Sequence, residues 1–159
     1  MNRVRLYRRA QQLLPPAIET SGMRRFALPP DPLRCLLPGP SPRRASHGAV
    51  MLELSDHAAA AIARQGLAYF DGATTSRGVL PPRGPTQYEP WRRSPLPEAW
   101  RHMAPESGLW PGVAHADAGM HRRLSVAWRD GAYYTQLRNG VGWLVVLPGE
   151  RLVVYSWRD

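Results

Sequence analysis

The last 36 residues alternate between short apolar runs and turn residues. The apolar runs are 124–128, 133–137, 143–147 and 152–157, and the turns between them are Asp130-Gly131, Asn139-Gly140 and Pro148-Gly149-Glu150. Asp-Gly and Asn-Gly favour tight turns because these residues tolerate positive φ. The pattern predicts an antiparallel meander of three or four strands, in which Asn139-Gly140 is either a two-residue hairpin or a bulge within a longer strand.

A helix is predicted over residues 55–70. Ser55 is a good N-cap, Asp56 suits the positive end of the helix dipole, and the alanine-rich segment that follows has high helix propensity. Asp71-Gly72 supplies a stop signal. A second, shorter helix is predicted over residues 97–103, with Pro97 in its first turn.

The first 48 residues have a different character. A short helix over residues 1–14 would have only a ragged apolar stripe, and Pro15-Pro16 would end it. Frequent prolines after that point predict an irregular segment over residues 15–48. We therefore expect two parts, an irregular Pro/Arg-rich arm (1–48) and a small α+β domain (49–159). In this domain, the 55–70 helix packs on the C-terminal antiparallel sheet.

Composition removes several chemistries. All 21 basic residues are arginine, and with 12 acidic residues the formal net charge is +9. A chain without lysine has no Schiff-base chemistry and no P-loop lysine. Its single cysteine, Cys35, excludes an internal disulfide and a multi-cysteine zinc site. The apolar runs are too short to span a membrane, so we expect no membrane span. We also expect a cytoplasmic location and no cofactor.

Two clusters of polar residues have a simpler explanation than chemistry. Ser55-Asp56-His57 contains the residue types of a hydrolytic triad, but adjacent helical side chains point about 100° apart and cannot align for relay. A helix cap explains this tripeptide better. His115, Asp117 and His121 are possible metal ligands, yet their spacing fits no known site, so a solvated loop is preferred and no metal site is assigned.

Charge and aromatic residues suggest a nucleic-acid-binding module as one alternative function. Residues 1–50 hold nine arginines and only two acids. Four tryptophans precede an arginine, at positions 91, 100, 128 and 157, and such pairs can stack on bases and contact phosphates. In a strand, the same pairs arise where one residue faces the core and the next faces water. A G+C-rich gene would also produce arginine-rich, proline-rich stretches without any selected partner. The candidate phosphate-binding residues are Arg3, Arg5, Arg8, Arg9, Arg24, Arg25, Arg43 and Arg44.

Two blocks of the chain resemble β-lactamase-like serine hydrolases, a family that includes penicillin-binding-protein-type esterases and nylon-oligomer-hydrolase-like amidases. The first block, Ala61 to Gly72 followed by Arg77-Gly-Val-Leu-Pro81, is similar to a helix and turn of that family, although Ala61 replaces its aspartate and Gln65 its aromatic residue. Leu96-Pro-Glu-Ala-Trp100 resembles the Pro-Glu-x-Trp that follows. The second block, Arg138 to Tyr155, resembles the late strand pair, with Arg138-Asn139-Gly140 in the place of a Lys-Thr-Gly-like motif.

The resemblance implies a hydrolase that has lost its chemistry. The family nucleophile is the serine of Ser-x-x-Lys, and no such lysine exists in this chain. A Tyr-x-Asn or Ser-x-Asn motif and the closing helix after the last strand are also missing. The leading expectation is a non-catalytic fragment or remnant of an amide or ester hydrolase, in which Arg138, Asn139 and Gly140 border the substrate site. Its partner would be a complementary hydrolase half or a second copy of the chain.

A small metal-independent ribonuclease toxin is a further alternative. General acid–base cleavage needs a histidine near a phosphate-binding arginine. The residues that would supply this chemistry are His121, Arg122, Arg123 and Tyr134.

Overall fold

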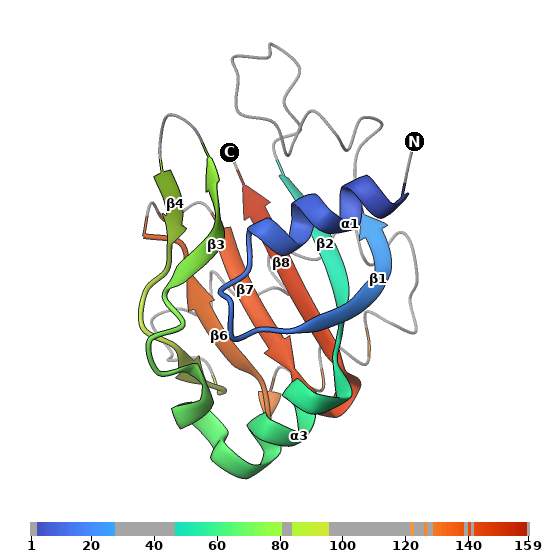
Figure 1. The fold of residues 1–159 in the computed structure, drawn as a ribbon. Helices are drawn as coiled ribbons and strands as arrows, with labels where there is room; N and C mark the ends of the chain where they lie inside the picture. Colours follow the sequence, from blue (N-terminus) through green and yellow to red (C-terminus); the bar gives the residue numbers. More distant parts are fainter. Residues whose placement is uncertain are drawn as a thin grey trace.

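The computed structural model describes residues 3–27, 47–80, 84–95, 122, 126, 129–138, 140 and 142–158. Within these residues, two α-helices combine with a six-stranded antiparallel sheet and a separate two-stranded hairpin (Figure 1). The expected α+β class is confirmed, as is the packing of the 55–70 helix with the C-terminal strands.

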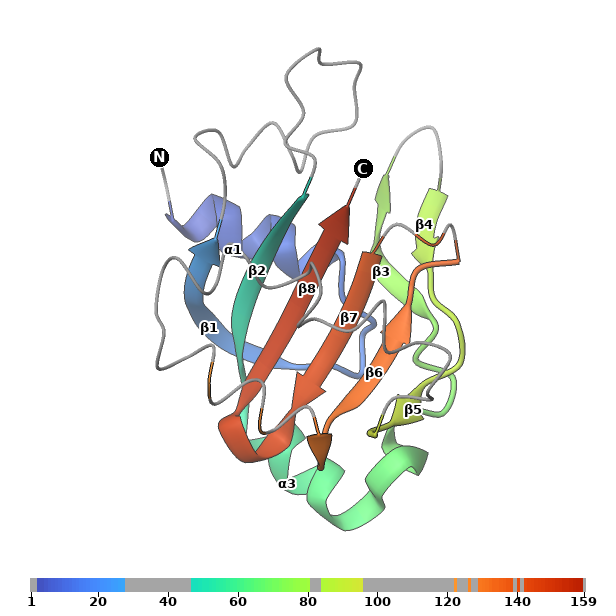
Figure 2. The same cartoon turned by 180° about the vertical axis from the view of Figure 1, so that it is seen from behind.

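The large sheet brings the beginning and the end of the chain together. Its strand order is β1 (Thr20–Ala27), β2 (His47–Leu54), β8 (Leu152–Arg158), β7 (Gly142–Leu147), β6 (Tyr133–Gln136) and β5 (Arg92–Arg93). β2 pairs with β8 from His47–Arg158 to Glu53–Leu152. An early strand therefore lies inside the sheet beside the last strand, as both ribbon views show (Figures 1 and 2).

The predicted meander is confirmed as β6, β7 and β8, but two other parts of the expectation are wrong. The sheet is larger than three or four strands because β1 and β2 extend it on one side and β5 on the other. Residues 20–27, expected to be irregular, form β1, which pairs with β2 through two shifts of register.

The connection between β6 and β7 and the segment around Val126 differ from expectation, and one expected helix lies outside the described residues. The connection between β6 and β7 is longer than the two-residue hairpin expected at Asn139-Gly140, because the Leu137 amide donates to the Gly142 carbonyl (2.9 Å). It joins two separate strands, so the expected bulge within one strand is wrong as well. Gly140 has a φ of 76° in this loop, a value that glycine adopts easily. Val126, within the strand expected at 124–128, is helical and exposed. Residues 97–103 are not among those described.

The helix α1 (Arg3–Gln12) ends just before Pro15-Pro16, as the sequence predicts, and it belongs to the main core. Leu6, Ala10 and Leu14 are buried, and Ala10 and Leu14 pack in the same cluster as side chains of β2, β7 and β8. The segment 3–27 is thus part of the folded unit and not a separate arm.

The hairpin of β3 (Thr75–Leu80) and β4 (Gly84–Gln87) supports α1 from one side. Gly78 faces Gln12 so closely that a Cβ there would lie 2.6 Å from the Gln12 Cβ and 2.9 Å from its carbonyl oxygen. Only a residue without a side chain allows the helix and the strand to approach this far.

The helix α3 (Asp56–Gln65) covers one end of the sheet, where Ala58 and Ile62 enter the core. Ser55 caps it as predicted, because its Oγ accepts a hydrogen bond from the Ala58 amide (3.1 Å). The chain continues as a 3-10 helix, η1 (Gly66–Phe70), before Asp71-Gly72 ends the segment. Phe70 then stacks on Trp91 with ring centroids 4.3 Å apart, which joins η1 to the start of β5.

The sheet is buried on both faces. On the α1 side lie Val50, Leu52, Leu144, Val146 and Val153, all in one core cluster. The alternate residues Met51, Val145 and Val154 face the other way and are also buried. No helix among the described residues is long and apolar enough to cross a membrane.

Candidate polyanion-binding surface

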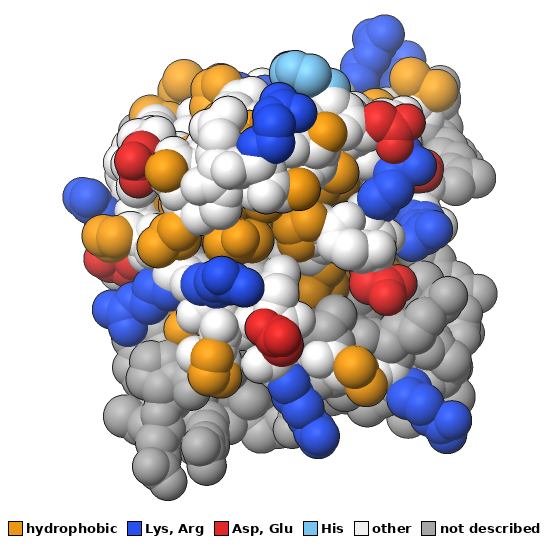
Figure 3. All heavy atoms as spheres, turned by 90° about the horizontal axis from the view of Figure 1, so that it is seen from below, with side chains coloured by type: hydrophobic (Ala, Val, Ile, Leu, Met, Phe, Trp, Pro, Cys, Tyr) orange, Lys and Arg blue, Asp and Glu red, His pale blue; other side chains and the backbone are white. Residues whose placement is uncertain are grey.

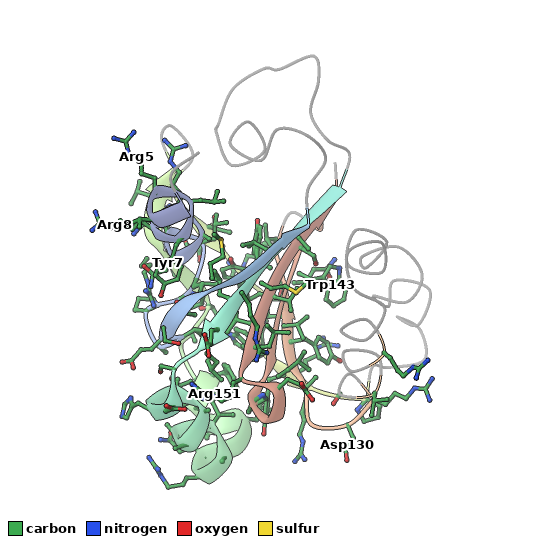
Figure 4. The ribbon with its side chains drawn as sticks, turned by 90° about the vertical axis from the view of Figure 1, so that its right-hand side faces the viewer. Arg5, Tyr7, Arg8, Asp130, Trp143 and Arg151 are labelled. Carbon is green, nitrogen blue, oxygen red and sulfur yellow. The ribbon has the colours of Figure 1, made fainter. Side chains whose placement is uncertain are left out.

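The outer side of α1 carries three arginines. Arg5, Arg8 and Arg9 are all exposed, and their spacing of i, i+3 and i+4 places them on one side of the helix. In Figure 4, Arg5 and Arg8 project from α1 away from the sheet. We call Arg5, Arg8 and Arg9 the arginine face.

The arginine face is not neutralised by the part of the chain that the structure describes. None of its three guanidinium groups has a hydrogen bond or an ion pair there. The first acidic residue of the sequence is Glu19, so no acid stands on α1 itself. Arg5 also lies in the first turn, where the helix dipole disfavours a positive charge. The electrostatic cost of this arrangement would fall when an anion binds.

Hydrogen bonds hold α1 in a defined orientation. The Tyr7 hydroxyl donates to the Thr20 carbonyl (2.6 Å), and Gln11 Nε2 donates to the Tyr7 hydroxyl (2.8 Å). At the other end of the helix, the buried Tyr88 hydroxyl donates to the Leu13 carbonyl. The arginine face is therefore presented by a rigid element, which lowers the entropy lost on binding.

Other arginines have structural partners and differ clearly from the arginine face. Arg77 Nη2 donates to three carbonyls in the segment after α1, those of Pro15, Pro16 and Ile18, at 2.8–3.2 Å. Arg151 pairs with Asp56 at 2.8 Å and lies 3.8 Å from Glu53.

The surface at the α3 end of the molecule has mixed charge. There, basic and acidic side chains are interspersed (Figure 3). The uncompensated positive charge is thus a property of α1 and not of every described surface.

Of the predicted basic residues whose side chains the structure describes, Arg24 lies apart from the arginine face. Arg24 donates to the Glu150 carbonyl (3.2 Å) in η4 (Pro148–Glu150), at the end of the sheet far from α1 (Figure 1). The side chains of Arg3 and Arg25 and the whole of Arg43 and Arg44 lie outside the described residues. Among the described side chains, the candidate surface therefore consists of Arg5, Arg8 and Arg9.

The predicted substrate-site residues lie at the loop between β6 and β7. Arg138 is exposed, and its amide donates to the Gln87 carbonyl (3.1 Å), which ties the loop to β4. Gln136 Nε2 donates to the Gly140 carbonyl (3.3 Å). Asn139 is outside the described residues.

The Ser55-Asp56-His57 tripeptide forms the start of α3 and not a catalytic relay. His57 Nδ1 lies 3.2 Å from the Glu19 carboxylate, and Ser55 Oγ lies 3.5 Å from the same oxygen. Ser55 and His57 thus share a carboxylate and make no hydrogen bond to each other. The sequence did not predict the contact between Glu19 and His57, because the two residues are 38 positions apart.

The described residues hold no group of metal ligands, and His115, Asp117 and His121 are not among them. Of the Trp-Arg pairs, Trp91 is buried, with its Nε1 donating to the Ala73 carbonyl (2.7 Å), while Arg92 is exposed. This pair fits the core-and-water explanation. The side chains of Trp100, Trp128 and Trp157 lie outside the described residues.

The structure describes two of the four residues of the ribonuclease alternative, Tyr134 and Arg122. Tyr134 is buried in β6, and burial raises its pKa, with Arg92 acting in the opposite direction. A buried tyrosine with a raised pKa is poorly placed for proton transfer to RNA. Arg122 is exposed, but His121 and Arg123 are not described.

No significant match to this chain is found among protein-family models, curated proteins or solved structures.

Proposed function

We propose that this protein binds nucleic acid through the arginine face of α1. The observation that carries the proposal is the set of three exposed arginines on one side of a firmly docked helix, without acidic partners among the described residues. Guanidinium groups suit phosphate because they donate in a planar, bidentate geometry. The expected cytoplasmic location would give the chain access to such a partner.

An anionic membrane surface fits the same charge less well. A helix that binds in the lipid interface buries an apolar side among the acyl chains. The apolar side of α1 already packs inside the protein, since Leu6 and Ala10 are buried. Val4 is the only large apolar side chain that α1 exposes. Charge alone would then hold the protein at a membrane, and three arginines supply little attraction.

The test compares two triple variants with equal loss of charge. Arg5→Gln/Arg8→Gln/Arg9→Gln removes the arginine face, and Arg64→Gln/Arg93→Gln/Arg129→Gln removes three exposed arginines elsewhere. We expect the first to weaken binding to labelled duplex DNA at low salt by about tenfold or more, and the second to change it little. Thermal melting would show that both variants keep the fold.

Equal losses in the two variants would mean that net charge, and not the arginine face, attracts the partner. Binding to phosphatidylserine vesicles without binding to DNA or RNA would overturn the proposal in favour of a membrane surface.

As a second proposal, the chain descends from a β-lactamase-like hydrolase, as its resemblance to that family suggests. Its two blocks lie together in space: Ile62 and Phe70 of the first share a core cluster with Leu144 and Val153 of the second. A non-catalytic remnant of this kind is compatible with a binding role for α1.

A fluorophosphonate probe tests this second proposal, and we expect no serine labelling of the chain alone. A complementary hydrolase half would restore labelling when mixed with the chain. Stoichiometric labelling of the chain alone would contradict the loss of the nucleophile.

A further inference from the structure

We infer that the arginine face binds the phosphate backbone of a duplex without reading its sequence, and prefers a duplex to a single strand. This inference rests on the proposed nucleic-acid binding and specifies the form of the partner. Three features of the structure lead to it: the setting of α1, the lack of an exposed aromatic among the described side chains, and the spacing of the arginines on α1.

The setting of α1 leaves only its outer side free to meet a duplex. Sequence is read in the major groove, where an inserted helix reaches the base edges. The inner side of α1 is buried along its length, and β1 and β3 contact it (Figure 1). The outer side that remains carries three arginines, and guanidinium groups pair with phosphate oxygens in a bidentate geometry.

Single-strand binding depends on aromatic side chains that stack on bases. Among the aromatic side chains whose burial the structure describes, none is exposed. Tyr7, the aromatic residue of α1, is half-buried, and its hydroxyl is occupied by Thr20. Trp143 lies on the opposite side of the sheet from α1 (Figure 4). The described surface around α1 can therefore attract nucleic acid by positive charge, but it provides no described aromatic side chain for stacking on bases.

The spacing of the arginines suits neighbouring phosphates. Arg5 and Arg9 stand one turn apart, about 6 Å along the helix axis, with Arg8 between them. A binder that uses charge alone favours the polymer with the higher charge density. A duplex carries one charge for about every 1.7 Å of its axis, twice the density of one of its strands.

The experiment measures fluorescence anisotropy with labelled duplexes of three unrelated sequences and with their separated strands, over a series of salt concentrations. We expect affinities for the three duplexes within about threefold of each other, and weaker binding to every single strand. If each arginine meets one phosphate, the Arg5→Gln/Arg8→Gln/Arg9→Gln variant should reduce the slope of log K against log salt by about 2.7. The Arg64→Gln/Arg93→Gln/Arg129→Gln variant should keep the wild-type slope.

A preference of tenfold or more for one duplex, or tighter binding to single strands, would overturn this inference and leave the proposed function standing. A salt slope unchanged in the arginine-face variant would overturn it too. Failure to bind any DNA or RNA would instead remove the proposed function itself.

Discussion

Two buried tyrosines make the protein sensitive to alkaline pH. Burial raises the pKa of Tyr155 from 10.0 to about 12. The pKa of Tyr88 is raised well above 10.0, first by burial and then by the nearby Tyr155. A raised pKa in the folded state means that the unfolded chain loses its protons first as the pH rises, so the free energy of unfolding falls above pH 10.

For Tyr155 alone, we expect the free energy of unfolding to drop by roughly 2 kcal/mol as the pH rises from 10 to 12. Denaturant titrations at several pH values measure this drop. Because the chain has no lysine, tyrosines dominate titration in this range. Tyr155→Phe should flatten the curve, and an equally steep curve in that variant would contradict the assignment.

The arginines show at the same scale how one residue type takes different roles. Arg77 and Arg151 stabilise the fold through carbonyl and carboxylate partners, whereas the arginine face has none among the described residues. The sequence alone does not separate these groups, because the partners of Arg77 stand 59 to 62 positions away.

At the scale of elements, the contact between α1 and β3 depends on Gly78. We expect Gly78→Ala to lower the free energy of unfolding by about 1–3 kcal/mol, because the new methyl group would overlap Gln12 and push the helix outward. Chemical denaturation measures the change.

Gly149→Ala is the matched control for Gly78→Ala, since a Cβ at position 149 meets no atom within 4 Å. If both substitutions have the same small effect, the close approach of α1 to β3 is not a constraint. A displaced α1 should also weaken nucleic-acid binding, which links the packing of this helix to the proposed function.

Local signals predicted several elements correctly. The cap at Ser55, the end of α1 before Pro15-Pro16 and the last three strands all agree with the structure. These features depend on neighbouring residues, so a short stretch of sequence contains the physical cause. No local pattern predicted β1, because its partner strand β2 begins 20 residues after β1 ends, beyond a proline-rich segment.

At the scale of the whole molecule, the first 27 residues should be essential for folding. Ala10, Leu14 and Ile18 belong to the main core, and β1 covers an edge of β2. We expect a chain lacking residues 1–27 to lose its cooperative thermal transition, as measured by circular dichroism. A cooperative melt close to that of the full chain would support the two-part organisation expected from composition.

This dependence affects how binding is tested. Deleting the basic segment would remove charge and core together, so lost binding would not identify the cause. The arginine-face variant removes charge while leaving Leu6, Ala10 and Leu14 in place. Point substitutions are therefore the more informative test of the proposed surface.

By itself, the sequence determined the excess of arginine, the missing lysine chemistry, the cap at Ser55, the end of α1 before Pro15-Pro16 and the C-terminal meander, because each depends on composition or on adjacent residues. Only the tertiary structure decided that β2 lies beside β8, that α1 enters the core, and which arginines have partners. Those outcomes depend on contacts between residues far apart in the chain, such as Val50 with Tyr155, and no local pattern specifies such a pairing.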